Sequence, residues 1–252
     1  TPAGAFPSSG ADVKHTVGST TGDWQFVNFN NRLSCFHVDT VPQRYDGSAS
    51  AGSKWAAFDN AHRPATVSSG EFKPSCAAGF YGRLWVGGVA EERDVLHYST
   101  LLDSDDFRIT SVNSASNGGS FDLKNVWGKD DIIAIAPFYG QLAVFGRNNI
   151  ALYTRPDSVS NMALSEVIRG VGCIARDSVQ SIGDDLVFLS STGLRSLART
   201  SEKDKVPLTD LSVNIKDTLI RNIGQSTEVK SAYIEDEGIY VMTFTASNIT
   251  YV

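Results

Sequence analysis

The chain has 252 residues, of which 41% are hydrophobic and 20% are charged. Its 22 Lys and Arg residues against 28 Asp and Glu residues give a formal net charge of −6. The composition excludes an intrinsically disordered chain, and the acidic balance argues against a protein that binds nucleic acid through a basic face. The longest apolar run, residues 132–138, is far shorter than the roughly 20 residues that span a bilayer, so we expect no membrane-spanning segment.

Five segments along the chain share one pattern, in which an apolar strand, a polar turn and a second apolar strand follow one another. They are residues 24–37, 76–89, 133–146, 179–190 and 230–244. Their turns contain Asn, Gly, Asp or Glu, which favour tight turns, and this predicts an antiparallel hairpin in each segment. A third strand is expected after each hairpin, carrying in turn Tyr45, Tyr98, Tyr153, Leu197 and Tyr251.

Aligning the five turns places one aliphatic residue at an equivalent position of each second strand. These residues, 44 to 58 positions apart, are Leu33, Leu84, Leu142, Leu186 and Ile239. A meander repeated at this period is typical of a β-propeller, whose blades bury their faces against one another. We therefore predict an all-β protein, a β-propeller of about five antiparallel blades with the five aligned residues in the blade cores. A β-sandwich is the alternative, although its turns usually lack this self-similarity.

The end of the chain bears on domain organisation, because the fifth unit stops at Val252 before a fourth strand is complete. We predict a single propeller domain over residues 1–252. Either the N-terminal segment supplies a closing strand, or the chain is an incomplete part of a larger propeller in a longer protein.

One segment departs from the β pattern and predicts a short inserted helix near residues 210–223. Pro207 precedes it, Gly224 follows it, and apolar residues recur at helical spacing between them. This stripe consists of Leu211, Ile215, Leu219 and Ile223. The helix is expected either to fill a connection between two blades or to contact another subunit.

Residues with catalytic potential do not form a recognisable constellation. Acidic clusters at 103–106, 130–131, 184–185 and 235–237 resemble the paired carboxylates of glycosidases, but the last two fall in predicted turns, where acids are common. We expect all four clusters to be solvated and to contribute little to folding. The cluster at 103–106 lacks the Gly and Glu of a calcium-binding EF-hand loop.

Metal and cofactor motifs are also missing from the sequence. The histidines, His15, His37, His62 and His97, stand singly, and Cys35, Cys76 and Cys173 are far apart. Neither set has the spacing of a zinc site, and the cysteines are expected to be small core residues. There is no nucleophile elbow and no phosphate-binding loop. We expect no catalytic site, no metal and no cofactor.

Three stretches together resemble a known family of viral proteins. They are IAIAPFYGQLAVFGRNNIALY at 133–153, GVGCIA at 170–175 and SVQSIGDDLVFLSSTGLRSL at 178–197. An earlier segment, LHYS followed by LDSDDF at 96–107, has the same likeness. These patterns resemble the propeller of the tail nozzle, or packaged-DNA stabilisation, proteins of short-tailed bacteriophages.

The resemblance implies a structural protein of the virion tail and not an enzyme. Such proteins form a ring, usually of six identical copies, beside the tail adaptor and other tail proteins. The ring holds packaged DNA in place, and double-stranded DNA later leaves through it without sequence-specific binding. Arg32, Arg83 and Arg147 flank hairpin turns and strand ends, so they are candidate contacts to the lumen or to a neighbouring subunit.

Two other functions remain open on the sequence. A secreted propeller could bind carbohydrate or cleave glycosides, with Trp55, Trp85 and Trp127 stacking on sugar rings. A cellular interaction propeller is the third possibility.

Overall fold

The computed structural model describes residues 23–50, 54–110, 115–157, 159–198, 211–223, 228–246 and 249–251. The chain divides into two compact units, with the boundary between Phe121 and Asp122. The expectation of a single domain within a longer chain stays a prediction, and the predicted helix boundaries Pro207 and Gly224 lie outside the described residues.

The first unit contains two four-stranded antiparallel meanders, in which each strand lies beside the next along the chain. The first blade consists of β1 (Gln25–Phe29), β2 (Arg32–His37), β3 (Thr40–Asp46) and β4 (Trp55–Ala57). The second blade consists of β5 (Cys76–Phe80), β6 (Arg83–Gly87), β7 (Val95–Tyr98) and β8 (Gly119–Asp122). A 3-10 turn at Asn60–His62 lies in the connection between them.

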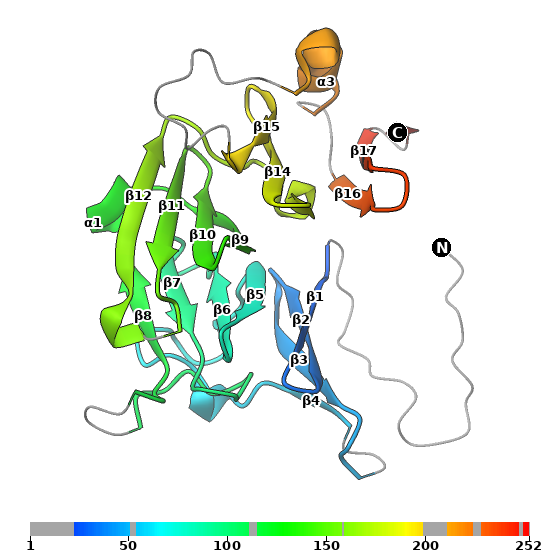
Figure 1. The fold of residues 1–252 in the computed structure, drawn as a ribbon. Helices are drawn as coiled ribbons and strands as arrows, with labels where there is room; N and C mark the ends of the chain where they lie inside the picture. The colour runs from blue at the N-terminus through cyan, green and yellow to red at the C-terminus, as the bar shows by residue number, and fades with distance from the viewer. Residues whose placement is uncertain are drawn as a thin grey trace. The chain divides into compact units, whose positions relative to one another are not determined.

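The second unit contains three more meanders, preceded by the short helix α1 (Lys124–Trp127) (Figure 1). The third blade consists of β9 (Ile132–Phe138), β10 (Gln141–Gly146), β11 (Asn149–Thr154) and β12 (Ala163–Arg169). The fourth consists of β13 (Gln180–Ile182), β14 (Asp185–Ser190) and β15 (Gly193–Ser196). The fifth consists of β16 (Glu228–Ile234), β17 (Ile239–Ala246) and β18 (Ile249–Tyr251). Further 3-10 turns cover Val159–Asn161, Arg176–Ser178 and Val213–Ile215.

All five predicted hairpins are confirmed, and their turns follow from residues that accept positive φ. Asn30 and Asn31 have φ of 45° and 61°, and the Tyr-Gly pairs at 81–82 and 139–140 adopt the same left-handed conformation. Two successive residues of this kind make a type I′ turn, which matches the twist of the paired strands. In the fourth and fifth hairpins only Gly183 and Gly238 have positive φ. The first three repeats therefore share one turn geometry, and the last two reach a hairpin through a different turn.

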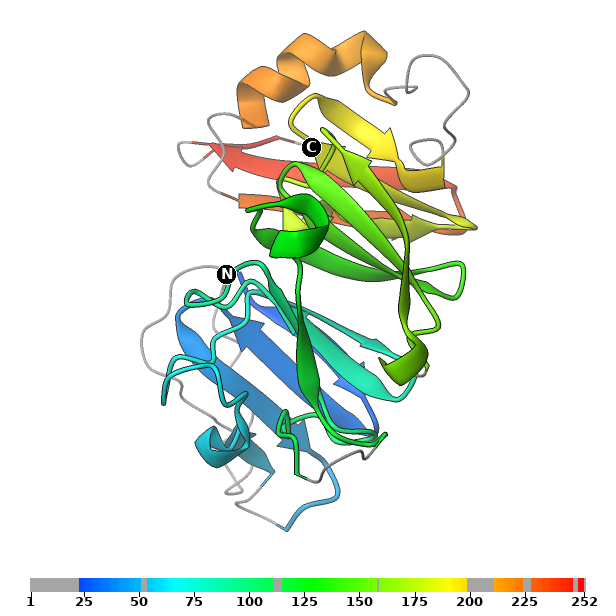
Figure 2. The same cartoon turned by 90° about the vertical axis from the view of Figure 1, so that its left-hand side faces the viewer.

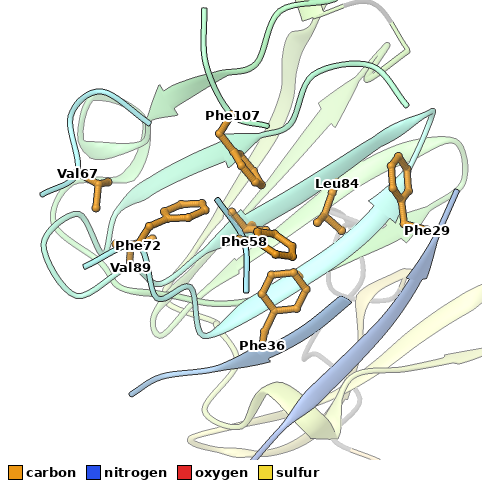
Figure 3. Close-up of a cluster of buried hydrophobic side chains, with 10 residues drawn as sticks. Phe29, Phe36, Phe58, Val67, Phe72, Leu84, Val89 and Phe107 are labelled. Carbon is orange, nitrogen blue, oxygen red and sulfur yellow. The ribbon is translucent and has the colours of Figure 1, made fainter. Parts of the chain in front are cut away.

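Each unit has its own apolar core between neighbouring blades. In the first unit, aromatic side chains from both blades and from their loops pack together, with Phe36 and Phe58 edge to face at a centroid distance of 5.9 Å (Figure 3). In the second unit, Phe145 of the third blade packs against Phe188 of the fourth, with ring centroids 5.1 Å apart. Burying both faces of a meander in this way is what makes a blade dependent on its neighbour.

The predicted blade-core residues divide into three groups. Leu84, Leu142 and Leu186 are buried as predicted, and Leu33 is half-buried. The prediction is wrong for Ile239, which is 45% exposed. Ile239 pairs with the equally exposed Ile234 directly beside a four-residue turn, so the hairpin end of the fifth blade extends out of its core. Phe244, five residues further on, is the buried residue of that strand.

The predicted inserted helix is present but shorter than expected, because α3 covers only Lys216–Ile223. Leu211 and Ser212 are held against β15, since the Leu211 amide donates to the Leu194 carbonyl and the Ser212 hydroxyl accepts from the Leu194 amide. Of the predicted stripe, Leu219 is buried against the fourth and fifth blades, whereas Leu211 and Ile215 are exposed. Figure 2 shows α3 in orange beside β15 and β17.

A glutamine on a first strand connects neighbouring blades in both units. The Gln25 amide donates to the Ala77 carbonyl (2.9 Å) and accepts from the Ala77 amide (2.7 Å). Gln180 likewise donates to the carbonyl of Ser231 on β16 at 3.1 Å. Ala77 and Ser231 lie on the first strand of the next blade, which has one edge without a neighbouring strand. The glutamine side chain therefore satisfies backbone groups on that open edge. The chain is thus all-β, with the meander blades of a β-propeller.

Candidate functional site

A cluster of five charged side chains joins the first two blades. Arg32 on β2 and Arg44 on β3 face the loop that follows β7, which carries Asp103 and Asp105. Arg44 Nε lies 3.0 Å from Asp105 Oδ2, and Arg32 Nη1 lies 3.4 Å from Asp103 Oδ1. Arg32 also pairs within its own blade, where its Nε lies 3.1 Å from Asp46 Oδ2. We call these five residues the interblade charge cluster.

Hydrogen bonds to the turns of two hairpins hold the acidic loop of this cluster in place. Leu102 adopts a positive φ of 61°, which turns its amide toward the Gly82 carbonyl of the neighbouring hairpin at 2.7 Å. The Asn30 side chain of the first blade donates to the Leu102 carbonyl at 2.6 Å. The loop therefore contacts the turns of both hairpins, and Asp103 and Asp105 follow directly after this anchor.

Within the cluster, burial has its largest effect on Asp105. It raises the pKa of Asp105 to about 6, an effect that the hydrogen bond with Asp103 increases and the positive charges of Arg44 and Arg32 oppose. Hydrogen bonds from Ser48 lower the pKa of Asp46, with a smaller contribution from Arg32. A polar cavity of about 250 Å³ lies beside Arg32, Asp46 and Asp103. Each of these carboxylates already has an arginine partner, and the arrangement favours holding two blades together over presenting a nucleophile.

The three arginines predicted to contact the lumen or a subunit lie in different environments. Arg32 is half-buried and engaged within the chain by the cluster just described. Arg147 is exposed in the turn between β10 and β11, and a residue that contacts the lumen or another subunit must be exposed in this way. For Arg83 the prediction is wrong, because its side chain is only 2% exposed.

The Arg83 guanidinium is enclosed within the second blade. Its Nη1 donates to the carbonyls of Ser99 (2.5 Å) and Asn117 (2.7 Å), and its Nη2 donates to the Ala115 carbonyl. The guanidinium also lies over the Tyr98 ring, 5.2 Å from its centroid. Burial lowers the pKa of Arg83. It is a structural cation that fixes the long loop before β8, and no partner outside the chain can reach it.

Two of the acidic clusters also differ from the prediction that all are solvated. Asp105, Asp106 and Asp130 are buried, with 5–8% exposure. Asp130 accepts hydrogen bonds from the amides of Arg147 and Asn148 and from the Asn149 side chain, which closes the turn between β10 and β11. Asp105 pairs with Arg44 and Asp130 caps the turn at 147–149, so both are buried against groups distant in sequence, whereas Asp106 accepts from Arg108 two residues further on. The cluster at 235–237 is exposed in a turn, as predicted.

The tryptophans offer little surface for stacking on sugar rings. Trp85 is fully buried and Trp127 is 5% exposed. Trp55 is half-buried and packs against Tyr45, with ring centroids 5.0 Å apart.

The cysteines and two of the histidines lie in the core. All three cysteines are buried with free thiols, and burial raises the pKa of Cys35 and of Cys173 to about 11. His37 and His97 are fully buried in strands. Within the described part of the chain, no three His, Cys, Asp or Glu side chains gather as they would around a metal ion, and no helix is both long and apolar enough to cross a membrane.

Comparison with known proteins finds similarity in structure only. No family model and no curated protein sequence matches the chain. A solved structure with similarity is the extracellular domain of the putative one component system BT4673 from B. thetaiotaomicron, with 13% identity and a TM-score of 0.50 over 94% of this chain. This chain spans 28% of the length of that structure. Hsv2 of Kluyveromyces lactis, a β-propeller, matches with 12% identity and a TM-score of 0.41 over 88% of this chain and 72% of its own length. At such identities the likeness concerns the fold alone.

Proposed function

We propose that this chain is a structural, non-catalytic protein of a phage tail, which forms an oligomeric ring that retains packaged DNA and through which the genome is ejected. The observation that carries the proposal is the segment at 133–197, which resembles tail nozzle proteins and folds as the third and fourth blades. Its motif residues are glycines and apolar residues, and Gly146 and Gly172 each have a geometric task in the blade.

Close approach of the backbone explains the paired glycines of this segment. A Cβ on Gly172 would lie 2.4 Å from the Gly146 carbonyl oxygen and from the Arg147 carbonyl carbon. A Cβ on Gly146 would lie 2.5 Å from Asp130 Oδ2. Both distances are far below van der Waals contact, and in each case the neighbour is backbone or a buried carboxylate. The resemblance therefore rests on blade geometry, which supports an architectural role.

The charge distribution supports a conduit that DNA passes without tight binding. The net charge is −6, and Arg32 and Arg83 are engaged within the chain, so they contribute little to counterion release on a duplex. The same resemblance implies three further properties. The chain forms a ring of identical subunits, usually six, it has the tail adaptor as a neighbour, and it is located in the virion tail.

A reconstruction of the intact particle tests the proposal. We expect a closed ring of this chain below the portal, around a channel wide enough for duplex DNA. A monomer located on the capsid surface would contradict it, as would tight, site-specific DNA binding by the free protein at physiological salt.

A further inference from the structure

A pocket of about 510 Å³ in the first unit combines two arginines with apolar side chains. It lies between the loop that follows the Asn60–His62 turn and the loop that precedes β8. Its lining includes Arg63, Ala65, Thr66, Arg108, Ile109 and Ser120. We call it the Arg63–Arg108 pocket.

Both guanidinium groups of this pocket are oriented by the protein and keep donors unused. Arg63 donates from Nε to the Val67 carbonyl and from Nη1 to the Asn60 carbonyl, each at 2.8 Å, and it has no carboxylate partner among the described residues. Arg108 donates from Nε and Nη2 to Asp106. Arg63 Nη2 and Arg108 Nη1 therefore remain for a ligand. Pre-oriented guanidinium donors are suited to a carboxylate, since less side-chain entropy is lost on binding.

The edge of the pocket is apolar and open to solvent. Ile109 is 75% exposed, the most exposed of the large hydrophobic side chains described, and Ala65 is also exposed. An isolated exposed isoleucine is ordinary, but one that borders two arginines forms a surface for an acidic segment that also carries aliphatic side chains.

A segment of this kind is present at the hairpin end of the fifth blade. The turn Glu235-Asp236-Glu237-Gly238 is exposed, and the residues on either side, Ile234 and Ile239, are 42% and 45% exposed. None of its three carboxylates has an ion-pair partner among the described residues. We call residues 234–239 the acidic tip.

We propose that the acidic tip of one copy of the chain docks in the Arg63–Arg108 pocket of the next copy. Carboxylates of the tip accept from Arg63 Nη2 and Arg108 Nη1, while Ile234 and Ile239 cover Ile109. The two surfaces are different, so the contact is heterologous, and repeated heterologous contacts close into a ring when the rotation allows. The inference rests on the proposed ring and supplies the surfaces that would build it.

Disulfide cross-linking between two variants tests the contact directly. Ala65→Cys places a thiol at the pocket, and Asp236→Cys places one at the tip. The native cysteines are all buried, so they do not compete. The two variants are mixed in assembled rings under mild oxidation. We expect a cross-linked dimer that contains one chain of each variant, and its absence from rings that do form overturns the contact while leaving the proposed function standing. A chain that forms no ring, alone or in the tail, overturns both.

Substitutions at Ile109 separate this contact from accidental proximity. Its side chain is exposed and makes none of the bonds that hold the loop, so the fold is expected to tolerate a charge there. Ile109→Asp in the pocket-bearing variant should reduce the cross-linking yield at least about tenfold, because like charges then face one another. Ile109→Lys at the same position also loses the apolar contact but attracts the acidic tip, so it should reduce the yield much less than Ile109→Asp does. Equal yields from the two variants, with unchanged thermal unfolding, overturn the proposal.

Discussion

Arg83 provides the sharpest test of how the second blade is held together, because a buried cation without a carboxylate partner among the described residues is uncommon. The change to consider is Arg83→Met, which keeps much of the side-chain volume and removes every donor. Three carbonyl groups, those of Ser99, Ala115 and Asn117, then lose their partner.

The size of the effect follows from these three groups. A buried acceptor left without a partner costs about 1–3 kcal/mol, and the relief of desolvating the guanidinium offsets part of the total. The Ser99 bond is buried, whereas the Asn117 and Ala115 bonds are part-buried and Ala115 itself is exposed, so we expect Arg83→Met to lower the free energy of unfolding by about 2 kcal/mol. Arg83→Lys should be intermediate, since one ammonium group cannot reproduce the planar fork.

Urea unfolding followed by tryptophan fluorescence measures this effect. Trp85 is fully buried and packs against Tyr98 at a centroid distance of 5.4 Å, so it reports on the environment of Arg83. The matched control is Arg147→Met on an exposed turn, which should change the free energy of unfolding by less than about 0.5 kcal/mol. A loss below about 1 kcal/mol for Arg83→Met would refute the reasoning that this arginine is structural.

Three further predictions concern other buried groups. Asp130→Ala should lower the free energy of unfolding by about 3 kcal/mol, because several donors lose a charged acceptor. The control Asp236→Ala, at an exposed position, should be near neutral. Equal effects of the two variants in urea unfolding would contradict a structural role for Asp130. Leu142→Ala should cost about 2–5 kcal/mol and Ile239→Ala less than about 1 kcal/mol, and calorimetry that ranks them in the opposite order would show the blade register to be wrong. Burial lowers the pKa of His97 to about 4, below its usual 6.5, so the unfolded chain binds the proton more readily and stability falls as the pH drops from 6.5 toward 4. Between pH 6.5 and 5 this histidine lowers the free energy of unfolding by about 1–2 kcal/mol. The pH dependence of unfolding should be weaker by that amount in His97→Phe, and an unchanged pH dependence would contradict the buried, neutral state of His97.

The sequence alone determined the hairpins, because everything that defines them is local. Pairs such as Asn30-Asn31 and Tyr139-Gly140 set the turn, and the apolar alternation on either side of them sets the strands. The aligned residues Leu33 and Leu142 lie opposite Tyr45 and Tyr153 in the register, as the repeated spacing indicates. A period visible in the chain was therefore enough to identify a meander architecture.

The tertiary structure decided what happens between blades and between distant loops. Gln25 and Ala77 are 52 positions apart, and Arg32 and Asp103 are 71 apart, so no local pattern shows that they meet. The same holds for Arg83, which looks like a turn arginine in the sequence but is enclosed when the loop before β8 folds over it. Burial of a polar side chain depends on which distant backbone returns to cover it, and that is settled only when the blades pack.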